Sequence, residues 1–447
     1  MDEKPIDLAW LRPSEIMIEV ELTQCREEGK DISAVEALSS ELNTLDFSDT
    51  RNIERFEEFL DMTAALPVVD GFPCEEPSDL DGIRAKRSGN EQTHKYSLDE
   101  ETLFDKVYGA WLGRISGCML GKPVEGKNSS AIRKYLEATG DWPLTTYFSS
   151  NADEEARASC EISPDLSREG MNRAIEDDDT NYTTTGLAII KKYGSDFSSN
   201  NVAEFWLSNI PVLRTFTAER IAYRNFLNFI APPRSAHYQN VCREWIGAQI
   251  RADFYGYISP GQPARAAEFA WRDARISHVK NGIYGAMWVA AMLAAAYTTA
   301  DIEGVIRAGL AQIPCTSRLH ESIEDVIDEY NKGLGYEEAV EVLRARWDES
   351  RVHDWCHTIS NAMIVAMSLL WGGGDFTRTL SCAVTPGFDT DCNAATAGSV
   401  LGLILGAKAL PSQWTGPLND TLETGVSGYH RVSISDMARE TISLITR

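Results

Sequence analysis

Hydrophobic positions along this chain recur mostly at helical spacing, every three or four residues, from about residue 97 onward. Strict alternation of apolar and polar residues between turn signals is scarce, so few strands are expected. The pattern predicts an all-α protein. The expected helices cover residues 98–120, 179–192, 202–207, 264–274, 282–298, 301–312, 320–332, 336–348, 358–370, 376–384, 393–405 and 433–446. The first of these begins with Ser97 and Glu100 in a capping-box pattern.

Several of these segments are rich in alanine and glycine, most clearly 282–298 and 393–405. Small side chains let helix axes approach closely, and helices that are apolar all round are usually buried. We therefore expect a multi-helix bundle whose central helices lie inside it.

The first hundred residues have a different character. Shorter amphipathic helices are expected at 14–28, 32–45 and 52–60, with Gly29 as a C-terminal cap. The stretch 67–90, which is rich in proline and glycine, reads as a linker or an irregular arm. We predict an N-terminal helical extension and linker at 1–95, packed on a catalytic domain at 96–447.

Composition narrows the classes of function. The net charge of −25 disfavours binding to nucleic acid and to anionic membranes. Nine scattered cysteines without zinc-like spacing indicate free thiols in a reducing compartment. Neither a signal peptide nor a membrane-spanning stretch is evident, so a cytoplasmic protein is expected. The oligomeric state cannot be read from these features.

Two acidic motifs stand far apart in the chain, Glu176-Asp177-Asp178-Asp179-Thr180 and Asp389-Thr390-Asp391-Cys392. Each precedes a helix of small or apolar residues. Clustered carboxylates repel one another, and burying them without compensation costs several kcal/mol each. If the fold brings the motifs together, one or two divalent cations are the expected compensation. Oxygen ligands favour Mg²⁺, Mn²⁺ or Ca²⁺ over zinc.

Each motif also has a plain structural explanation. An acidic residue at the start of a helix can act as an N-cap and complement the helix dipole. One aspartate is enough for that purpose, whereas Asp177, Asp178 and Asp179 follow one another directly.

Two further motifs carry candidate chemistry. A helix with glycine at positions 109, 113, 117 and 121 is broken by Lys122-Pro123, which leaves Glu125 on a loop. Ser277-His278 precedes another small-residue helix. The plain alternatives are a close-packed helix with a surface glutamate, and a histidine with a structural hydrogen bond.

Taken together and in this order, the four motifs resemble the ADP-ribosylglycohydrolase family, which includes the dinitrogenase-reductase-activating glycohydrolases. The resemblance covers about residues 98–414 and leaves the N-terminal hundred residues outside. It implies an orthogonal all-α bundle with two Mg²⁺ or Mn²⁺ ions. It also implies hydrolysis of the N- or O-glycosidic bond at C1″ of ADP-ribose in a small-molecule or protein-attached ribosyl substrate.

The resemblance further implies roles for individual residues. The implied metal ligands are Asp177, Asp178, Asp179, Asp389 and Asp391. The implied catalytic residues are Glu125, Asp178 and Asp179, which would activate water or protonate the leaving group. The implied substrate-binding residues are His278, Gly387 and Phe388.

Two positions depart from the family pattern. Cys392 replaces a Thr or Ser that would ligate metal, and sulfur is a poor ligand for Mg²⁺. One of the two metal positions is therefore expected to be weakened. Cys118 replaces an aspartate in the glycine-spaced helix. The candidates to stack on a base are Tyr147, Phe148, Tyr255 and Tyr257, among which the sequence does not choose.

Two other functions stay open at this point. Clustered acids with two metals also suit a metal-dependent phosphohydrolase, although no P-loop pattern of an NTPase is present. A non-catalytic protein that binds ADP-ribose or metal on the same scaffold is the second alternative, and Cys392 and Cys118 are the residues that favour it.

Overall fold

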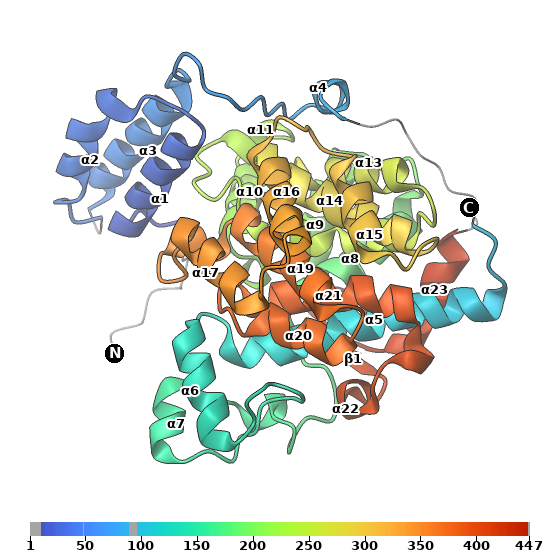
Figure 1. Cartoon of the computed structure of the whole chain (residues 1–447). Helices are drawn as coiled ribbons and strands as arrows, with labels where there is room; N and C mark the ends of the chain where they lie inside the picture. Colours follow the sequence, from blue (N-terminus) through green and yellow to red (C-terminus); the bar gives the residue numbers. More distant parts are fainter. Residues whose placement is uncertain (1–9, 48, 89–95, 446–447) are drawn as a thin grey trace.

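The protein is an all-α bundle, as the hydrophobic pattern predicted (Figure 1). The computed structural model describes residues 10–47, 49–88 and 96–445. The predicted boundary between residues 95 and 96 adjoins a gap at 89–95, which lies outside the described residues. Thr446, the predicted end of the last helix, also lies outside them.

Helices supply nearly all the regular structure. In the extension these are α1 (Glu15–Glu27), η1 (Ile32–Ala34, 3₁₀), α2 (Glu36–Leu42), α3 (Thr50–Ala65) and α4 (Leu80–Ala85). Up to residue 251 they are α5 (Glu100–Gly121), η2 (Lys122–Val124), α6 (Ser129–Thr139), α7 (Glu154–Ser159), η3 (Pro164–Leu166), α8 (Asp178–Tyr193), α9 (Ser199–Asn209), η4 (Val212–Arg214), α10 (Thr217–Leu227), α11 (Arg234–His237) and η5 (Ile246–Arg251).

The remaining helices are α12 (Asp253–Tyr257), α13 (Pro263–Ala274), α14 (Lys280–Ala296), α15 (Ile302–Leu310), α16 (Arg318–Asn331), α17 (Tyr336–Arg346), α18 (Val352–Cys356), α19 (Thr358–Gly372), α20 (Phe376–Val384), α21 (Thr390–Leu405), η6 (Ala407–Ala409), α22 (Ser412–Thr415), η7 (Gly416–Leu418) and α23 (Ile434–Ile445). Among the described residues, one antiparallel pair of short strands, β1 (Thr421–Glu423) and β2 (Arg431–Ser433), precedes α23.

The structure corrects the expected start of α5. Asp99, rather than Ser97, is the N-cap, and its Oδ1 accepts a hydrogen bond of 2.7 Å from the Thr102 amide. Aspartate caps a helix as well as serine does, so the helix starts later than the capping-box pattern indicated. The helices between residues 217 and 257 were not predicted from the hydrophobic pattern, because they are short and interrupted by irregular turns.

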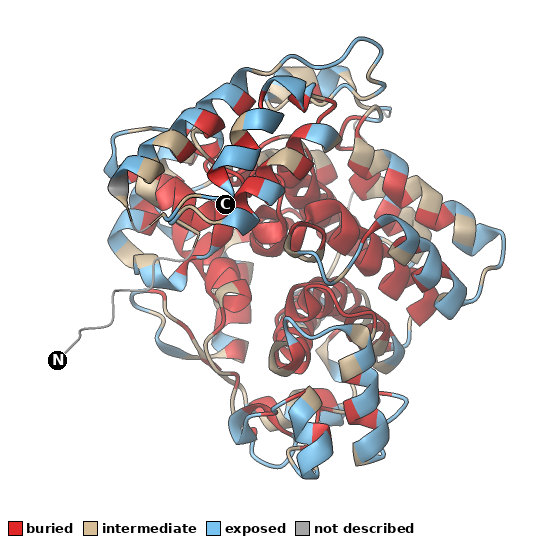
Figure 2. Ribbon diagram, turned by 90° about the vertical axis from the view of Figure 1, so that its left-hand side faces the viewer, coloured by how far each residue is buried: buried red, intermediate tan, exposed pale blue. Residues whose placement is uncertain are grey.

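The core is formed by helices that are apolar on every side. Helices α14, α19 and α21 lie in the middle of the bundle (Figure 1) and are buried along almost their whole length. Buried helices fill the centre of the molecule, with exposed segments around them (Figure 2). Small residues such as Ala290 and Ala394 leave room for close neighbours on all faces. These helices form the rigid frame on which the ends of α8 and α21 are placed.

The closest helix contact joins α5 to α21, which run antiparallel across the molecule (Figure 1). A side chain on Gly113 would collide with the carbonyl oxygen of Gly398, and one on Gly117 with that of Ala394. Gly121, at the end of α5, lies against the backbone of Thr390 at the start of α21. The glycine stripe therefore brings the loop that carries Glu125 next to the second acidic motif.

The N-terminal extension contacts the rest of the chain through buried ion pairs. Arg243 binds Glu21 at 2.6 Å and Glu28 at 2.8 Å, and both carboxylates come from α1 or its C-terminal cap. The stretch predicted as a linker is an irregular arm along the surface, with α4 in it. Its backbone is held by hydrogen bonds such as that from Trp271 Nε1 to the Ser78 carbonyl oxygen, 3.0 Å long.

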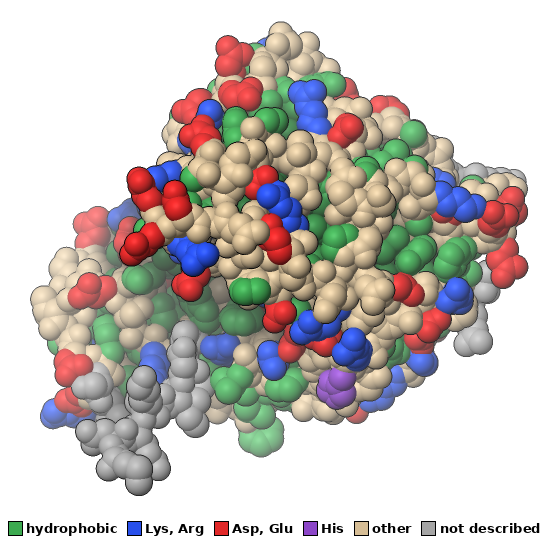
Figure 3. Space-filling view, turned by 90° about the horizontal axis from the view of Figure 1, so that it is seen from below, with side chains coloured by type: hydrophobic (Ala, Val, Ile, Leu, Met, Phe, Trp, Pro, Cys, Tyr) green, Lys and Arg blue, Asp and Glu red, His purple; other side chains and the backbone are tan. Residues whose placement is uncertain are grey.

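The surface carries many charged side chains, and the cysteines are unpaired, as the composition indicated. Acidic and basic side chains are interspersed over the face seen from below in Figure 3. All nine cysteines are free thiols. Within the described ranges, no helix is both long and apolar enough to cross a membrane.

The α5–α21 contact can be tested with Gly117→Ala. Helix propensity alone would make alanine more stable by about 1 kcal/mol. The added methyl group would meet the Ala394 carbonyl oxygen, so we expect instead a loss of about 2 kcal/mol, measured as a lower Tm. In the matched control Gly304→Ala in α15, the nearest atom is the movable Asp301 carboxylate, and little loss is expected. Equal effects at both positions would contradict this account of the contact.

Candidate active site

The two acidic motifs meet in one cavity. Three groups of side chains have ligand atoms within 4.8 Å of one another, and they share members: Asp177, Asp178 and Asp179; Asp179, Asp391 and Cys392; Glu125, Asp389 and Asp391. The cavity beside them has a volume of about 190 Å³. Carboxylates from positions more than two hundred residues apart thus form a single acidic floor.

The first motif is built at the start of α8. Asp177 is the N-cap, and its Oδ1 accepts a hydrogen bond of 2.9 Å from the Asp179 amide. The expected capping role is therefore present, but it occupies one carboxylate oxygen only. Asp178 and Asp179, in the first turn, project into the acidic clusters, so capping does not account for the run of three.

The second motif is aimed by a strained turn. Gly387 and Phe388 have φ angles of +80° and +60°, in the left-handed region. This conformation is energetically unfavourable for phenylalanine, and such strained residues often lie beside functional sites. The Asp389 amide then donates a hydrogen bond of 3.2 Å to Asn361 Oδ1. The turn is further held by Trp355 Nε1, which donates to the Phe388 carbonyl oxygen over 2.8 Å.

The floor has the features expected of a cation site. Asp389 Oδ1 and Asp391 Oδ1 are buried without a hydrogen-bond partner, which is costly for a carboxylate. Six carboxylates take part in the clusters, and two cations, Lys122 and Arg114, pair with them, which leaves an excess of four negative charges when all six are ionised. Two divalent cations would neutralise that excess, and the donor set is mainly oxygen.

Mutual repulsion and burial raise the pKa values of these acids. Burial, then the charge of Asp177, raises the pKa of Asp391 to about 6 and that of Asp178 well above its usual range. The charge of Asp391, then burial, raises the pKa of Glu125 in the same way. Glu125 as a whole residue is exposed on its loop, but its carboxyl group is turned toward Asp389 and Asp391, where it loses part of its solvation and can exchange protons with a bound molecule.

Two cations of this site were not identified from the sequence. Lys122 pairs with Asp177; burial opposes its charge, but that carboxylate raises the pKa of Lys122 above its usual range. Arg114 is fully buried and binds Asp179 and Asp253, each at 3.1 Å. A permanently charged arginine in an otherwise apolar helix needs an acidic partner. The position of Arg114 within the apolar segment 98–120 could therefore have indicated a buried ion pair from the sequence.

The two cysteines that depart from the family pattern are buried thiols. Cys392 Sγ lies in the cluster of Asp179 and Asp391, 3.2 Å from Asp179 Oδ2. Burial and these carboxylates raise the pKa of Cys392, so the thiol keeps its proton and ligates metal weakly. Burial likewise raises the pKa of Cys118, on α5.

Some predicted residues lie behind the cavity rather than on its wall. His278 is fully buried, with Nδ1 2.8 Å from Ser277 Oγ and Nε2 4.0 Å from Glu219, which does line the cavity. Gly387 and Phe388 are buried in the turn before Asp389, and none of the three is among the described residues that line the cavity. Their direct contact with substrate remains a prediction, and the geometry indicates a supporting position.

The candidates for base stacking are corrected. Tyr147, Phe148, Tyr255 and Tyr257 are all buried in the core and do not line the cavity. The hydroxyl groups of the three tyrosines make hydrogen bonds inside the protein, as in the 2.8 Å hydrogen bond from Tyr147 to the Trp414 carbonyl oxygen. The aromatic residues at the cavity are Trp10, Phe216 and Trp355, which helical periodicity could not single out.

A match to a family model supports the family resemblance. The model of the family described as ADP-ribosylglycohydrolase matches residues 99–445. A solved structure described as an ADP-ribosylglycohydrolase-related protein complex aligns over 77% of this chain and 99% of its own, with 16% identity and a TM-score of 0.46. No curated protein sequence matches.

The electrostatic strain of the floor predicts a pH effect in protein stripped of metal by a chelator. The folded pKa of Asp391, about 6, exceeds the unfolded value of about 3.9, so its ionisation destabilises the fold at neutral pH. Asp391→Asn should therefore raise the free energy of unfolding near pH 7 by an amount on the order of 2 kcal/mol, which is seen as a higher Tm. As the pH falls from about 6 towards 4, the wild type should regain this difference.

Calorimetry across this pH range in the presence of a chelator measures the effect. Asp61→Asn, an exposed aspartate on α3, is the control and should change little. A Tm difference between wild type and Asp391→Asn that does not vary with pH would contradict the assigned repulsion.

Proposed function

The chain belongs to the ADP-ribosylglycohydrolase family, and on this premise we propose that it is a metal-dependent hydrolase of ribosyl conjugates. The bond cleaved would be the glycosidic bond at C1 of the ribose in an ADP-ribosyl or related ribosyl group. The observation that carries this proposal is the meeting of two distant acidic motifs in one cavity, with buried carboxylate oxygens left without partners.

Five aspartates are the proposed metal ligands. Asp177, Asp178 and Asp179 would serve from the start of α8, and Asp389 and Asp391 from the start of α21. A bound Mg²⁺ or Mn²⁺ pair would supply a Lewis acid that binds ribose hydroxyl groups and lowers the pKa of water. The residues fit this assignment by their oxygen donors and by the excess of negative charge.

Glu125 is the proposed proton donor to the leaving group. The charge of Asp391 and then burial raise its pKa, a direction that favours the protonated form needed by a general acid. Asp178, which is half-buried, is the proposed base that orients and deprotonates the attacking water. Cleavage of a glycosidic bond develops positive charge on the sugar ring, which the nearby carboxylates would stabilise.

Turnover tests the proposal directly. We expect the Mn²⁺- or Mg²⁺-loaded protein to release ADP-ribose from ADP-ribosylated peptides or from small ADP-ribosyl conjugates. Asp389→Asn and Glu125→Gln should each lower kcat by about a hundredfold or more, because one removes a metal ligand and the other the proton donor. Chromatographic detection of free ADP-ribose is the measurement, with Asp61→Asn as the control.

Two other outcomes would each replace the proposal. Release of inorganic phosphate instead of ADP-ribose would identify a metal-dependent phosphohydrolase. Metal-dependent binding of ADP-ribose without turnover of any conjugate would identify a non-catalytic binding protein.

Cys392 provides a separate test of the metal assignment. Cys392→Ser replaces a protonated thiol with a hydroxyl group, a better ligand for a hard cation. We expect the variant to bind Mg²⁺ several-fold more tightly, as measured by titration calorimetry. Cys382→Ser, on α20 and outside the clusters, is the matched control. Unchanged or weaker Mg²⁺ binding in Cys392→Ser would show that position 392 does not face the ion.

A further inference from the structure

The cavity combines an acidic floor with an aromatic mouth. Trp10, Phe216 and Trp355 line it together with the carboxylates. Phe216 is 44% exposed, and the residue that follows it, Thr217, has a φ angle of +33°. An exposed aromatic residue and a strained backbone at the same place are features of a ligand site.

Trp10 differs from the other two in its origin. It comes from the N-terminal extension, whereas the family match begins at residue 99. Its ring packs edge to face against Trp245, with centroids 5.5 Å apart and an interplanar angle of 79°. Trp245 is fully buried, so Trp10 rests on a fixed part of the core while remaining partly open to the cavity.

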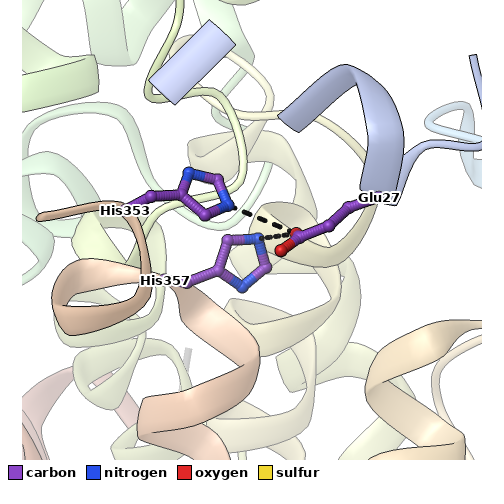
Figure 4. Close-up of side chains that lie close together, drawn as sticks. All are labelled: Glu27, His353 and His357. Atoms are coloured by element: carbon purple, nitrogen blue, oxygen red, sulfur yellow. Dashed lines mark ion pairs between the residues drawn. The ribbon is translucent and has the colours of Figure 1, made fainter. Parts of the chain in front are cut away.

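The extension is anchored beside the cavity by the Glu27 latch, which consists of Glu27, His353 and His357 (Figure 4). Glu27 Oε2, from the end of α1, lies 3.3 Å from His353 Nε2 and 3.4 Å from His357 Nε2. Both rings point at this carboxylate, and Arg318 adds a contact of 3.5 Å.

The hydrogen bonds of the two rings show that the latch is not a metal site. His357 Nδ1 accepts a hydrogen bond from the Ile359 amide, and His353 Nδ1 accepts one from the Trp245 indole. Since neither donor can reverse its role, the ring hydrogen of each histidine lies on Nε2, where a metal would need a lone pair. Burial lowers the pKa of His357 to about 3, which keeps that ring neutral.

The latch is continuous with the active site. Its histidines belong to α18 and the residue after it, and α18 also carries Trp355 and Cys356, which line the cavity. Trp355 holds the turn before Asp389, as described above. Trp245 contacts both Trp10 and His353, so one chain of contacts runs from the extension to the metal-binding turn.

We propose that Trp10 is a substrate-binding residue of this site, stacking its indole on a planar ring of the ribosyl ligand while the acidic floor holds the sugar. The proposal rests on the proposed function and names the ligand class, a ribose joined to an aromatic base. Stacking on a tryptophan is favourable for any base and needs no specific hydrogen bond. The extension, held by the Glu27 latch, thus determines part of the ligand preference.

The test compares two probes on the full-length, Mn²⁺-loaded protein. ADP-ribose carries an adenine base, whereas ribose 5-phosphate keeps the sugar and a phosphate but has no aromatic ring. In Trp10→Ala we expect the Kd for ADP-ribose to rise by about tenfold or more and that for ribose 5-phosphate to stay within about twofold. Trp10→Phe should restore most of the affinity, and Trp142→Ala, a partly exposed tryptophan elsewhere, should have no effect.

The alternative results overturn the proposal in distinguishable ways. Equal weakening of both probes in Trp10→Ala would make Trp10 a purely structural residue, and unchanged affinity for ADP-ribose would show that it does not touch the ligand. If wild-type protein hydrolyses conjugates in either case, only the role of Trp10 fails. If Trp10-dependent binding of ADP-ribose is found without turnover, the proposed function fails and the role of Trp10 stands. Wild-type protein that binds neither probe would refute both.

Discussion

Backbone contact between α5 and α21 is the constraint on which the rest of this structure depends. Side chains usually separate two packed helices, but here Gly113 and Gly117 let the backbones touch. Because the helices are antiparallel, the end of α5 meets the start of α21 at Gly121 and Thr390. The loop with Glu125 and the turn with Asp389 and Asp391 are therefore placed by the packing of two buried helices.

This packing forces an electrostatic problem that the protein solves only in part. Lys122 and Arg114 each neutralise one aspartate of the floor, and the other carboxylates remain crowded in a poorly solvated cavity. Such an arrangement lowers stability in the absence of cations. A site that is unfavourable alone and favourable with divalent cations is suited to bind them tightly, which is the physical basis of the proposed chemistry.

The parts that could be predicted from sequence are those encoded locally. Helical periodicity located most long helices, and the order of the four motifs indicated that Asp178 and Asp391 would converge. Tertiary partners were not predictable in this way. The sequence indicates that Arg114 needs an acidic partner but does not identify that partner, and it gives no sign that His278 lies behind Glu219. The four aromatic residues considered as candidates for stacking on a base are all core residues. Trp10 was missed because no local pattern shows which distant cavity a residue outside the main domain will line.

The most direct test of the central claim is an anomalous difference map from crystals of the full-length protein grown with Mn²⁺. The account predicts anomalous peaks among Asp177, Asp178, Asp179, Asp389 and Asp391, where the carboxylates converge. An ordered floor without any peak there would contradict the claim that these carboxylates are gathered to bind divalent cations.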